Sequence, residues 1–480
     1  MCIRDSVSRD VTSLDTGKAQ HLSLLSNGFC DWRGQITKDP GANHVKGEHP
    51  VVTVGFFSSE SVVYAEQDGA GINLVSEAGH TQNAAFLPNS IIDMVVFNRR
   101  VHFFSVDQQP YYYDGSKYVE NPSPALKQLK PSFGVSVGRR LAVAGIRGRE
   151  TEIHFSRVDD DTIFPEDEPT SSVSATRAAS FSVENQLGTS EVITGLAKFE
   201  QQRLAVFTND RVLVYYIDPD LNLWTLDDKA SVNIGCISHR TIQLAGADLI
   251  FCSRAGVHSL RRSLDNGITI EGESLSNKID ILYRELVASV ADPSSINAVY
   301  DQDMGQYSVF FPQAGNALSQ RLMMTLKPGV MDPKWSTADF LQSRCGAFLG
   351  GRLIYGSAGG IYEVGKIEDI KDIHPDMTVT FPVLWHGSFT DFKNVHSILL
   401  QASGDGTGTL EIINEENQTL QSDHFEISEG EDDNWFSDVP LSRQYERKME
   451  LRYRGAQYRL TVTGNNLVRI HGFGVMLRKQ

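Results

Sequence analysis

Several features are scarce in this sequence of 480 residues, and each scarcity excludes a class of protein. The five cysteines lie far apart, without the paired spacing of a zinc site or the density of a disulfide scaffold. No apolar run approaches the roughly 18 residues that a membrane-spanning helix needs. Basic residues number 44 against 60 acidic ones, and the net charge of -16 argues against nucleic-acid binding through a basic surface. We therefore expect no membrane-spanning segment, and the cysteine usage fits assembly in a reducing cytoplasm.

Familiar catalytic motifs are missing as well. The chain contains no HExxH or Walker A motif. The glycine run at 404–408 lacks the lysine and the strand-to-helix context of a phosphate loop, which favours a tight turn. Two acidic patterns, Asp218–Asn222 and Asp301–Gly305, place carboxylates at alternate positions as calcium loops do, but each has too few ligands. Turns between strands are the favoured interpretation, and we expect no enzyme activity, cofactor or metal.

The beginning of the chain and one cysteine need separate comment. Residues 1–6 are what a sequencing-library adapter would encode if it were read in frame, so we interpret them as an assembly artefact and expect the native amino terminus to be missing. Cys252 lies inside an apolar run, which favours a small buried hydrophobic residue over a reactive thiol.

A strand-turn-strand unit recurs along the chain. Each copy has a short apolar strand, often entered by arginine, then a small polar or glycine turn and a second apolar or aromatic strand. Copies begin near positions 52, 101, 141, 204, 249, 298 and 353. A four-stranded propeller blade takes about 40 to 50 residues, so the spacing predicts an all-β fold with a β-propeller-like body of about six to seven repeats over 7–365. The alternative is an irregular meander of hairpins without radial closure.

Two features interrupt this body. The longest interval between copies contains 158–179, an acidic and Ser/Thr-rich stretch that we interpret as an inserted surface loop. Apolar residues at helical spacing predict a helix over 277–290, with Pro293 just beyond its end. We expect this helix to cover a sheet edge or to touch a neighbouring subunit.

A second domain is expected at the carboxyl end. A charged linker over 366–376 is followed by residues 377–480, which alternate with a period of two and predict a β-sandwich. This domain ends in a basic stretch, whereas the rest of the chain is acidic. The basic stretch could steer copies or partners into one orientation, or could be an ordinary solvated face. The candidate interface residues are Arg452, Arg454 and Arg459.

One segment favours a different class of function. Ser263–Ile270 resembles the Asp box of sialidase-like propellers, except that Ile270 stands where the aromatic residue belongs. The Asp box closes a hairpin in that family and takes no part in catalysis. A sialidase also needs an arginine cluster, an acid and a tyrosine nucleophile around one sugar, and the sequence has no specific motif for them. A carbohydrate-binding or sialidase-like propeller is the alternative function, and a bacterial surface or scaffold propeller is a third.

Several segments in linear order resemble the tail-nozzle proteins of short-tailed bacteriophages, of the tail tubular protein B and packaged-DNA stabilisation types. The segments are 138–146 followed by 154–157, 193–200 leading into 203–208, 234–239, 253–257 and 439–441. The resemblance covers most of residues 30–480. It implies a structural subunit of the virion tail, assembled in the cytoplasm of a host bacterium.

The resemblance also implies partners. The expected assembly is a ring of six copies below the portal and adaptor proteins, in contact with tail fibre, spike or needle proteins. Such a ring closes the DNA channel of the particle and conducts DNA during ejection. DNA would pass without specific binding, and an acidic wall is compatible with this because it repels phosphate.

Overall fold

The computed structural model describes most of the chain. The described residues are 24–30, 35–69, 71–168, 176–188, 190–200, 203–218, 220, 223–260, 274–313, 320–326, 333–365, 372–381, 383, 392–414, 416–428, 443–453, 455–464 and 468–477. Within these ranges, no helix is both long and apolar enough to cross a membrane. The chain forms two compact units, one of His44–Gln320 with Leu341–Glu363, and one of Met1–Asn43, Arg321–Phe340 and Val364–Gln480.

The first unit consists of consecutive antiparallel sheets. Sheets one and two contain β5 (Val51–Ser58), β6 (Ser61–Asp68), β7 (Gly71–Ser76) and β8 (Thr81–Ala84), then β9 (Asp93–Phe97), β10 (Arg100–Phe104), β11 (Tyr111–Tyr113) and β12 (Tyr118–Glu120). Sheets three and four contain β13 (Phe133–Val137), β14 (Arg140–Ala144), β15 (Glu152–Phe155) and β16 (Ala179–Ser182), then β17 (Ile193–Phe199), β18 (Arg203–Thr208), β19 (Val212–Tyr216) and β20 (Thr225–Leu226).

Three further sheets complete the series. The fifth contains β21 (Gln243–Ala245), β22 (Asp248–Cys252) and β23 (Val257–Ser259), and the sixth contributes β24 (Asn297–Asp301) and β25 (Gln306–Phe311) to this unit. The seventh contains β28 (Cys345–Leu349), β29 (Arg352–Ser357), β30 (Gly360–Val364) and β4 (Ala42–Lys46). The middle strands are buried on consecutive positions, as β14 and β18 show, because neighbouring sheets cover both of their faces.

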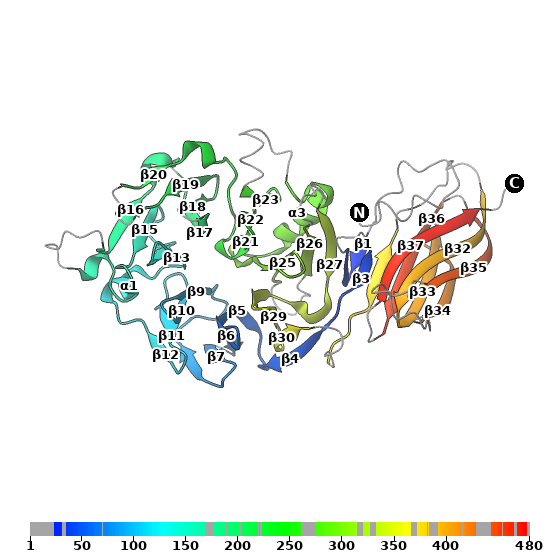
Figure 1. Ribbon diagram of the computed structural model, residues 1–480, viewed down its shortest axis with the longest axis horizontal. Coiled ribbons are helices and arrows are strands. Elements are labelled where there is room, and N and C mark those ends of the chain that lie inside the picture. The colour runs from blue at the N-terminus through cyan, green and yellow to red at the C-terminus, as the bar shows by residue number, and fades with distance from the viewer. Residues whose placement is uncertain are drawn as a thin grey trace, which may run out of the picture. The chain divides into compact units, whose positions relative to one another are not determined.

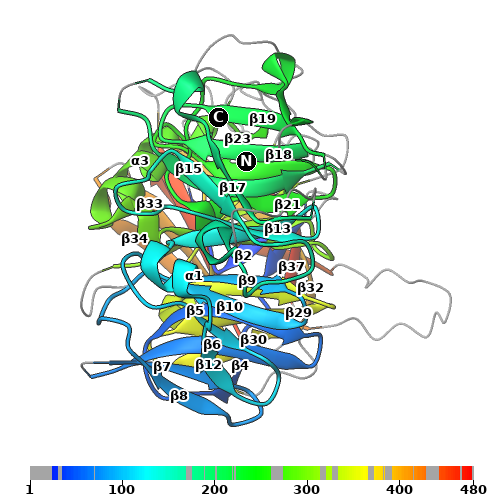
Figure 2. The same cartoon turned by 90° about the vertical axis from the view of Figure 1, so that its left-hand side faces the viewer.

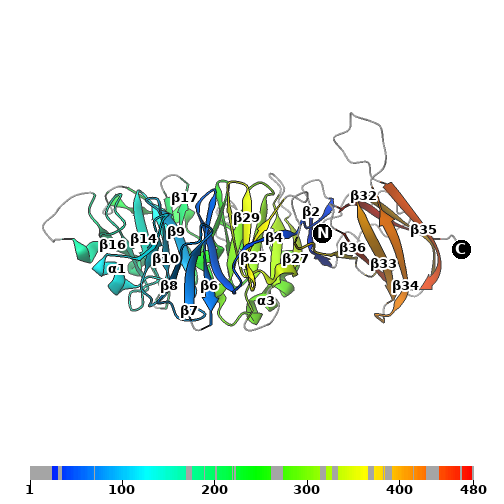
Figure 3. The same ribbon diagram turned by 90° about the horizontal axis from the view of Figure 1, so that it is seen from below.

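The sheets close into a ring, which Figure 1 shows with the sheets following one another in chain order. Strand β5 contacts β9, β9 contacts β13, and β13 contacts β17. The short 3-10 turn η5 (His239–Thr241) contacts β17 and β24, β24 contacts β28, and β28 returns to β5. Figure 3 shows the sheets edge-on, side by side. The unit is a closed seven-bladed propeller, which confirms the propeller prediction against the open meander, with one recurring unit in each blade.

The seventh blade is completed by a strand from the other end of the chain. Strand β4 pairs with β30 and supplies the outermost strand of this blade. Lys46 Nζ donates to the carbonyl oxygens of Ser76 and Glu77 in the first blade, both at 3.1 Å. Arg352 of the seventh blade also pairs with Glu77, at 3.3 Å. The closure therefore joins the first and last blades through both strand pairing and charged contacts.

Helix α1 (Pro124–Leu129) lies between the second and third blades (Figure 2). Proline is tolerated at its first turn, and the Ser123 hydroxyl accepts a hydrogen bond from the Leu126 N–H as an N-cap. The predicted helix at 277–290 is confirmed as a 3-10 turn, η7 (Asn277–Ile279), followed by α3 (Asp280–Ser289). Tyr283 and Leu286 are its buried residues.

The insertion in the third blade differs from the predicted surface loop. It runs from β15 to β16 and contains the turn η1 (Pro165–Asp167), and residues 169–175 within it lie outside the described residues. Phe164 is fully buried in a cluster with α1 and the second and third blades. Asp167 accepts hydrogen bonds from the Ser123 hydroxyl and from the Ala125 N–H. Phe164 and Asp167 thus anchor the first half of the insertion against α1 and the second and third blades.

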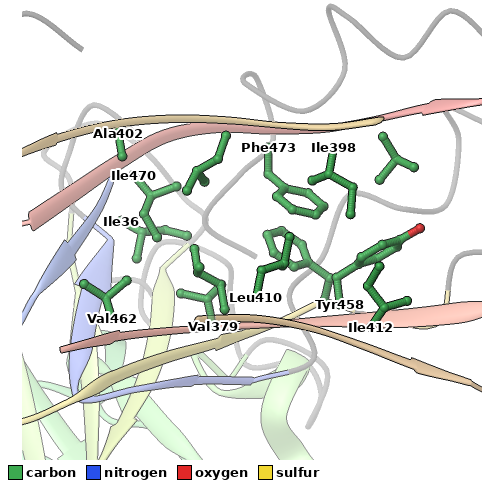
Figure 4. Packing of buried hydrophobic residues seen from close by; sticks show 14 of the residues in the cluster. Ile36, Val379, Ile398, Ala402, Leu410, Ile412, Tyr458, Val462, Ile470 and Phe473 are labelled. Carbon is green, nitrogen blue, oxygen red and sulfur yellow. The ribbon is translucent and has the colours of Figure 1, made fainter. Parts of the chain in front are cut away.

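The second unit is a β-sandwich. One sheet includes β26 (Gln320–Thr325), β27 (Lys334–Ala338), β1 (Leu24–Ser26), β31 (Met377–Thr380), β36 (Ala456–Thr463), β33 (Gly406–Asn414) and β34 (Thr419–Ile427). The other contains β2 (Gly28–Cys30), β3 (Ile36–Lys38), β37 (Val468–Leu477), β32 (Lys393–Gly404) and β35 (Arg443–Tyr453). Figure 4 shows Ile398 and Phe473 of one sheet facing Leu410 and Tyr458 of the other, within a core of buried residues.

The composition of the sandwich departs from the sequence-based boundaries. Residues 377–480 supply most of it, but β1, β2 and β3 from the amino-terminal region and the strands of 320–338 belong to the same unit. Strand β1 pairs with β31, and β3 pairs with β37, so these short strands cover ladders that would otherwise be open edges. Residues 1–6 and 366–371, part of the expected linker, lie outside the described residues.

Candidate functional site

A short turn from the fifth blade lies at the axis of the propeller. We call Ser238–Ile242 the axial turn. It contains η5 and precedes β21, the first strand of the fifth blade, whereas the other blades begin directly with their innermost strand. Its side chains reach groups on blades that are distant from the fifth in chain order. Because the innermost strands surround the axis, a turn that bridges them crosses the centre of the ring. We define Asp93, His239 and Arg240 as the axial cluster.

Arg240 extends from the axial turn to the first blade. Its Nη2 donates a hydrogen bond to the carbonyl oxygen of Val52 at 3.0 Å. The side chain is half-buried, and burial lowers the pKa of its guanidinium, an effect that the nearby Cys345 and Asp93 oppose. A cation contributed by blade five is therefore held beside blades one, two and seven.

His239 connects three other blades. The N–H of Leu196 on β17 donates to His239 Nδ1 at 3.2 Å, so this nitrogen acts as an acceptor and the proton of the neutral ring resides on Nε2. That Nε2 lies 3.5 Å from Asp93 Oδ2. The imidazole also stacks on Phe133, with ring centroids 4.8 Å apart. One ring thus contacts blades two, three and four.

Asp93 is the acidic member of the cluster. It begins β9, is buried, and accepts a hydrogen bond from the Gly134 N–H at 3.1 Å. Burial raises the pKa of this carboxyl, while His239, Gly134 and Arg240 oppose the increase. Its position at the start of an innermost strand places it at the same end of the ring as Val52 and Gly134, which also lie near strand starts.

Hydrogen bonds of Ser238 and Thr241 hold the axial turn against the sixth blade, and we call this group the polar hub. The Thr241 hydroxyl donates to the Ser238 carbonyl at 2.7 Å, and the Thr241 carbonyl accepts from the Tyr307 hydroxyl at 2.7 Å. The Ser238 hydroxyl donates to the Ser294 carbonyl at 2.8 Å. Tyr307 and Ser294 belong to the sixth blade and the turn before it. Ser238, Thr241 and Tyr307 are buried, so interior hydrogen bonds determine the position of the turn.

Two glycines make room for the turn. A Cβ on Gly195 would lie 2.5 Å from Ile242 Cδ1 and 3.3 Å from His239 Cα. A Cβ on Gly235 would overlap the backbone of Asn209 at the end of β18. Both positions therefore require glycine because of close approach, and Gly195 also lies at an irregularity in the register between β17 and β18.

The three arginines predicted as an interface are not brought together. Arg452 is exposed on β35, with its guanidinium carbon 4.8 Å from the ring centroid of Phe392. Arg459 is half-buried on β36, in the other sheet, and its Nη1 lies 3.5 Å from Glu411 Oε2 on the neighbouring strand β33. Arg454 lies outside the described residues. Of the two described arginines, Arg452 has an exposed charge, whereas Arg459 is paired within its own sheet.

Where the structure describes the weak sequence motifs, they form turns between strands. Asp301 Oδ1 accepts hydrogen bonds from the N–H groups of Asp303 and Met304, which confirms a turn between β24 and β25. In the run at 404–408, Gly404 ends β32, Asp405 forms the tight turn, and 406–408 begin β33. Asp218 accepts from the Asp220 N–H at 2.9 Å, and the rest of that pattern lies outside the described residues, as does Ser263–Ile270.

The described cysteines are buried, and Cys252 has the role of a small core residue, as predicted. Burial raises the pKa of the Cys252 thiol to about 11. In the part of the chain that the structure describes, no three His, Cys, Asp or Glu side chains are grouped as metal ligands.

Sequence reasoning missed the axial cluster. Asp93 is separated from the consecutive residues His239 and Arg240 by a long stretch of chain, and the three share no motif, so only the closure of the ring brings them together. One indication was present: the segment 233–242 contains several polar residues and a glycine immediately before a blade begins. That pattern departs from the apolar strand that starts other repeats, and a turn in place of a strand is its structural outcome.

No family model and no curated protein matches the sequence. The chain does resemble solved structures. The chain is similar to virginiamycin B lyase from Staphylococcus aureus at 9% identity, with a TM-score of 0.38 over 67% of this chain and 96% of that chain. It is similar to YCF48 bound to D1 peptide at 10% identity, with a TM-score of 0.37 over 68% and 94%. A third is Kluyveromyces lactis Hsv2, at 10% identity and a TM-score of 0.32 over 70% and 94%.

Proposed function

We propose that this protein is a structural subunit of the tail nozzle of a short-tailed bacteriophage, without catalytic activity. The observation that carries the proposal is where the segments of the family resemblance lie. Segment 138–146 contains the β13–β14 turn and β14, 154–157 begins at the end of β15, and segments 193–200 and 203–208 contain β17 and β18. Segment 234–239 leads into the axial turn. Segment 253–257 spans the turn between β22 and β23 in the fifth blade, so the resemblance follows three consecutive blades and the element that crosses their axis.

In this proposal, copies of the chain form a ring of six below the portal and adaptor proteins. The ring holds packaged DNA in the particle and conducts it during ejection. Because Arg240 and His239 lie across the axis of each propeller, DNA passes through the opening between subunits and not through a propeller. The partners are other copies, the portal and adaptor, and a tail fibre, spike or needle protein.

A charge difference along the chain supports a repeated interface between different surfaces of neighbouring copies. The net charge of the whole chain is -16, although its carboxyl-terminal stretch is basic. A cyclic ring needs one heterologous contact repeated about an axis, and opposite charges favour a single orientation of that contact. Arg452 is exposed on β35 and is positioned to take part in such a contact.

The interface is tested by Arg452→Glu in the full chain. Charge reversal at an exposed arginine should leave the fold unchanged and reduce the ring fraction in negative-stain microscopy and light scattering. Arg254→Glu is the matched control, because Arg254 is also exposed and lies in the propeller. Arg459→Glu is a poorer probe, since it also breaks the pair with Glu411. Equal ring fractions for Arg452→Glu and the wild type would exclude Arg452 from the interface.

The carbohydrate-binding or sialidase-like alternative remains a separate hypothesis, and a glycan array with a fluorogenic sialoside assay distinguishes it. The nozzle proposal predicts no turnover and no retained glycan. Robust turnover would replace the proposal. Portal and terminase genes beside the coding sequence would favour the phage assignment over a bacterial surface or scaffold propeller.

A further inference from the structure

A pocket of about 470 Å³ lies at one end of the β-sandwich. It is bounded by the tight turn between β32 and β33, by the end of β34 and by Gly464, which follows β36. The described residues that line it include two carboxylates, Asp405 and Glu426, and no basic side chain. The pocket therefore presents negative charge at this end of the sandwich.

Strand register places the polar groups of the pocket in one row. Thr407 on β33 is the partner of Glu426 on β34 and of Thr463 on β36. The hydroxyls of Thr407 and Thr463 are hydrogen-bonded at 2.6 Å. A Cβ on Gly406 would lie 2.7 Å from the carbonyl oxygen of Thr463, and a Cβ on Gly464 would lie 3.2 Å from the Cα of Gly406. Strand pairing and close backbone approach thus set the shape of the pocket.

The carboxylate of Glu426 is available to a ligand. Glu426 is exposed near the end of β34, the edge strand of its sheet, and it makes no ion pair with a described residue. One cation lies close to the lining, because Lys38 Nζ donates to the carbonyl oxygen of Gly464 at 2.8 Å. Lys38 is 2% exposed, and the carboxylates of Asp39 and Asp376 in its surroundings offset its charge.

A guanidinium group fits this lining better than a metal ion does. Its planar N–H donors bind carboxylates through charge-assisted hydrogen bonds. A calcium ion takes about six to eight oxygen ligands, whereas the described lining supplies two carboxylates. The same unit exposes a guanidinium group on Arg452, which is oriented by its contact with the ring of Phe392.

Arg452 and the pocket lie at opposite ends of one strand. Arg452 pairs with Asn394 at the start of β32, and Asp405 directly follows the last residue of β32. Because β32 has 12 residues and a strand rises about 3.3 Å per residue, the two are separated by roughly 35 Å. Arg452 therefore cannot enter the pocket of its own chain, whereas the arginine of another copy can.

We propose that the pocket of Asp405 and Glu426 receives Arg452 of a neighbouring copy, with the Glu426 carboxylate accepting from its guanidinium group. This inference rests on the proposed function, because it identifies the acceptor surface within the ring. A donor and an acceptor at opposite ends of one unit give a head-to-tail contact, which is the heterologous type that a ring repeats about its axis. Complementary charge then fixes the orientation of each copy.

The test compares ring formation by wild-type and variant full-length chains over a range of concentrations, by light scattering and negative-stain microscopy. Glu426→Arg should raise the concentration needed for half assembly about tenfold or more, because it places two guanidinium groups against each other. Glu426→Gln keeps the shape of the side chain and should raise this concentration less. Glu60→Lys is the matched control, because Glu60 is an exposed acid of the propeller, and it should assemble as the wild type does.

A mixing experiment shows whether the contact joins different copies. An equal mixture of Glu426→Arg and Arg452→Glu chains should restore the assembly that each lacks alone, since in alternating order every contact joins an arginine to a glutamate. Restored assembly also shows that both variants are folded. The pocket assignment is overturned if Glu426→Arg forms rings as the wild type does, if the mixture stays monomeric, or if assembly requires added calcium. A wild type that is monomeric at every concentration overturns the proposed function as well.

Discussion

Asp161 joins the insertion of the third blade to the second blade through two basic side chains. Arg100 Nη1 lies 2.8 Å from its Oδ2, and His102 Nε2 lies 3.1 Å from the same oxygen. Burial alone would raise the pKa of this carboxyl, but His102 and Arg100 outweigh it and lower the pKa below its usual range. The insertion is thereby fixed at a point where the sequence suggested only an exposed acidic loop.

Asp161→Asn should lower the free energy of unfolding by about 3 kcal/mol at pH 7, because removal of one member of a buried ion pair leaves the partners uncompensated. The depressed pKa means that the pair stabilises the fold above about pH 4 and loses this contribution as the pH falls toward the lowered pKa. Urea unfolding of both proteins from pH 7 to pH 3 measures this. A stability difference that stays constant over the range would contradict the assignment.

The residues of the axial cluster show why some single positions could not be predicted. Cys252 was identified from its apolar neighbours alone, since burial follows local hydrophobicity. Arg240 has no local pattern of that kind, and its role depends on Val52, which lies on a different blade. Contacts of this type form only when the ring closes, and a single sequence does not reveal them.

At the scale of elements, closure by β4 is the feature that links the ends of the propeller. Its fourth residue, Val45, packs against the core between the first and seventh blades. Arg352 contacts Glu363 within the seventh blade and Glu77 in the first. The sequence predicted the repeats but not this strand, because β4 is short and lies far in sequence from its partner β30.

Val45→Asp should destabilise the propeller by about 3 kcal/mol, since the charge would be placed in an apolar contact without a partner. Limited proteolysis should then cleave near β4 at a rate well above that of the wild type. Val96→Asp is the matched control, because Val96 is 52% exposed on β9. Similar cleavage of both variants would show that β4 does not hold the ring closed.

The segment before the axial turn requires a glycine at position 235, and this requirement can be tested. Gly235→Ala should cost about 1–3 kcal/mol, because the added methyl group overlaps the backbone of Asn209. Gly71→Ala is the control, since its Cβ would meet ordinary van der Waals neighbours, the nearest at 3.5 Å. Thermal unfolding compares the two variants. Equal stability would mean that the segment before the turn shifts freely.

At the scale of the whole molecule, the seven sequence repeats correspond to the seven blades. In the copies at 101, 141, 204, 249 and 353, the recurring unit is formed by the second and third strands, which are the most continuously apolar. The innermost strands are less regular, and in the fifth blade a turn precedes a very short one. The spacing of the repeats therefore predicted the number of blades but did not predict the turn that lies at the axis.

The sandwich was predicted in kind but not in composition. Alternation in β33 and β36 indicated half-buried strands, and their burial follows that alternation. Strands β1, β2 and β3 have three residues each, too few to show a period, and they join the unit from the other end of the chain. Long-range pairing of short strands cannot be obtained from local pattern.

The central proposal, a structural subunit that assembles into a nozzle ring, is tested most directly by the mass and shape of the purified full-length chain. Light scattering with negative-stain electron microscopy should show a closed ring with a central hole and six times the mass of one chain. The ring fraction should rise with protein concentration, as for any assembly governed by mass action. A compact monomer at every concentration, in the presence and absence of the portal and adaptor proteins, would contradict the account.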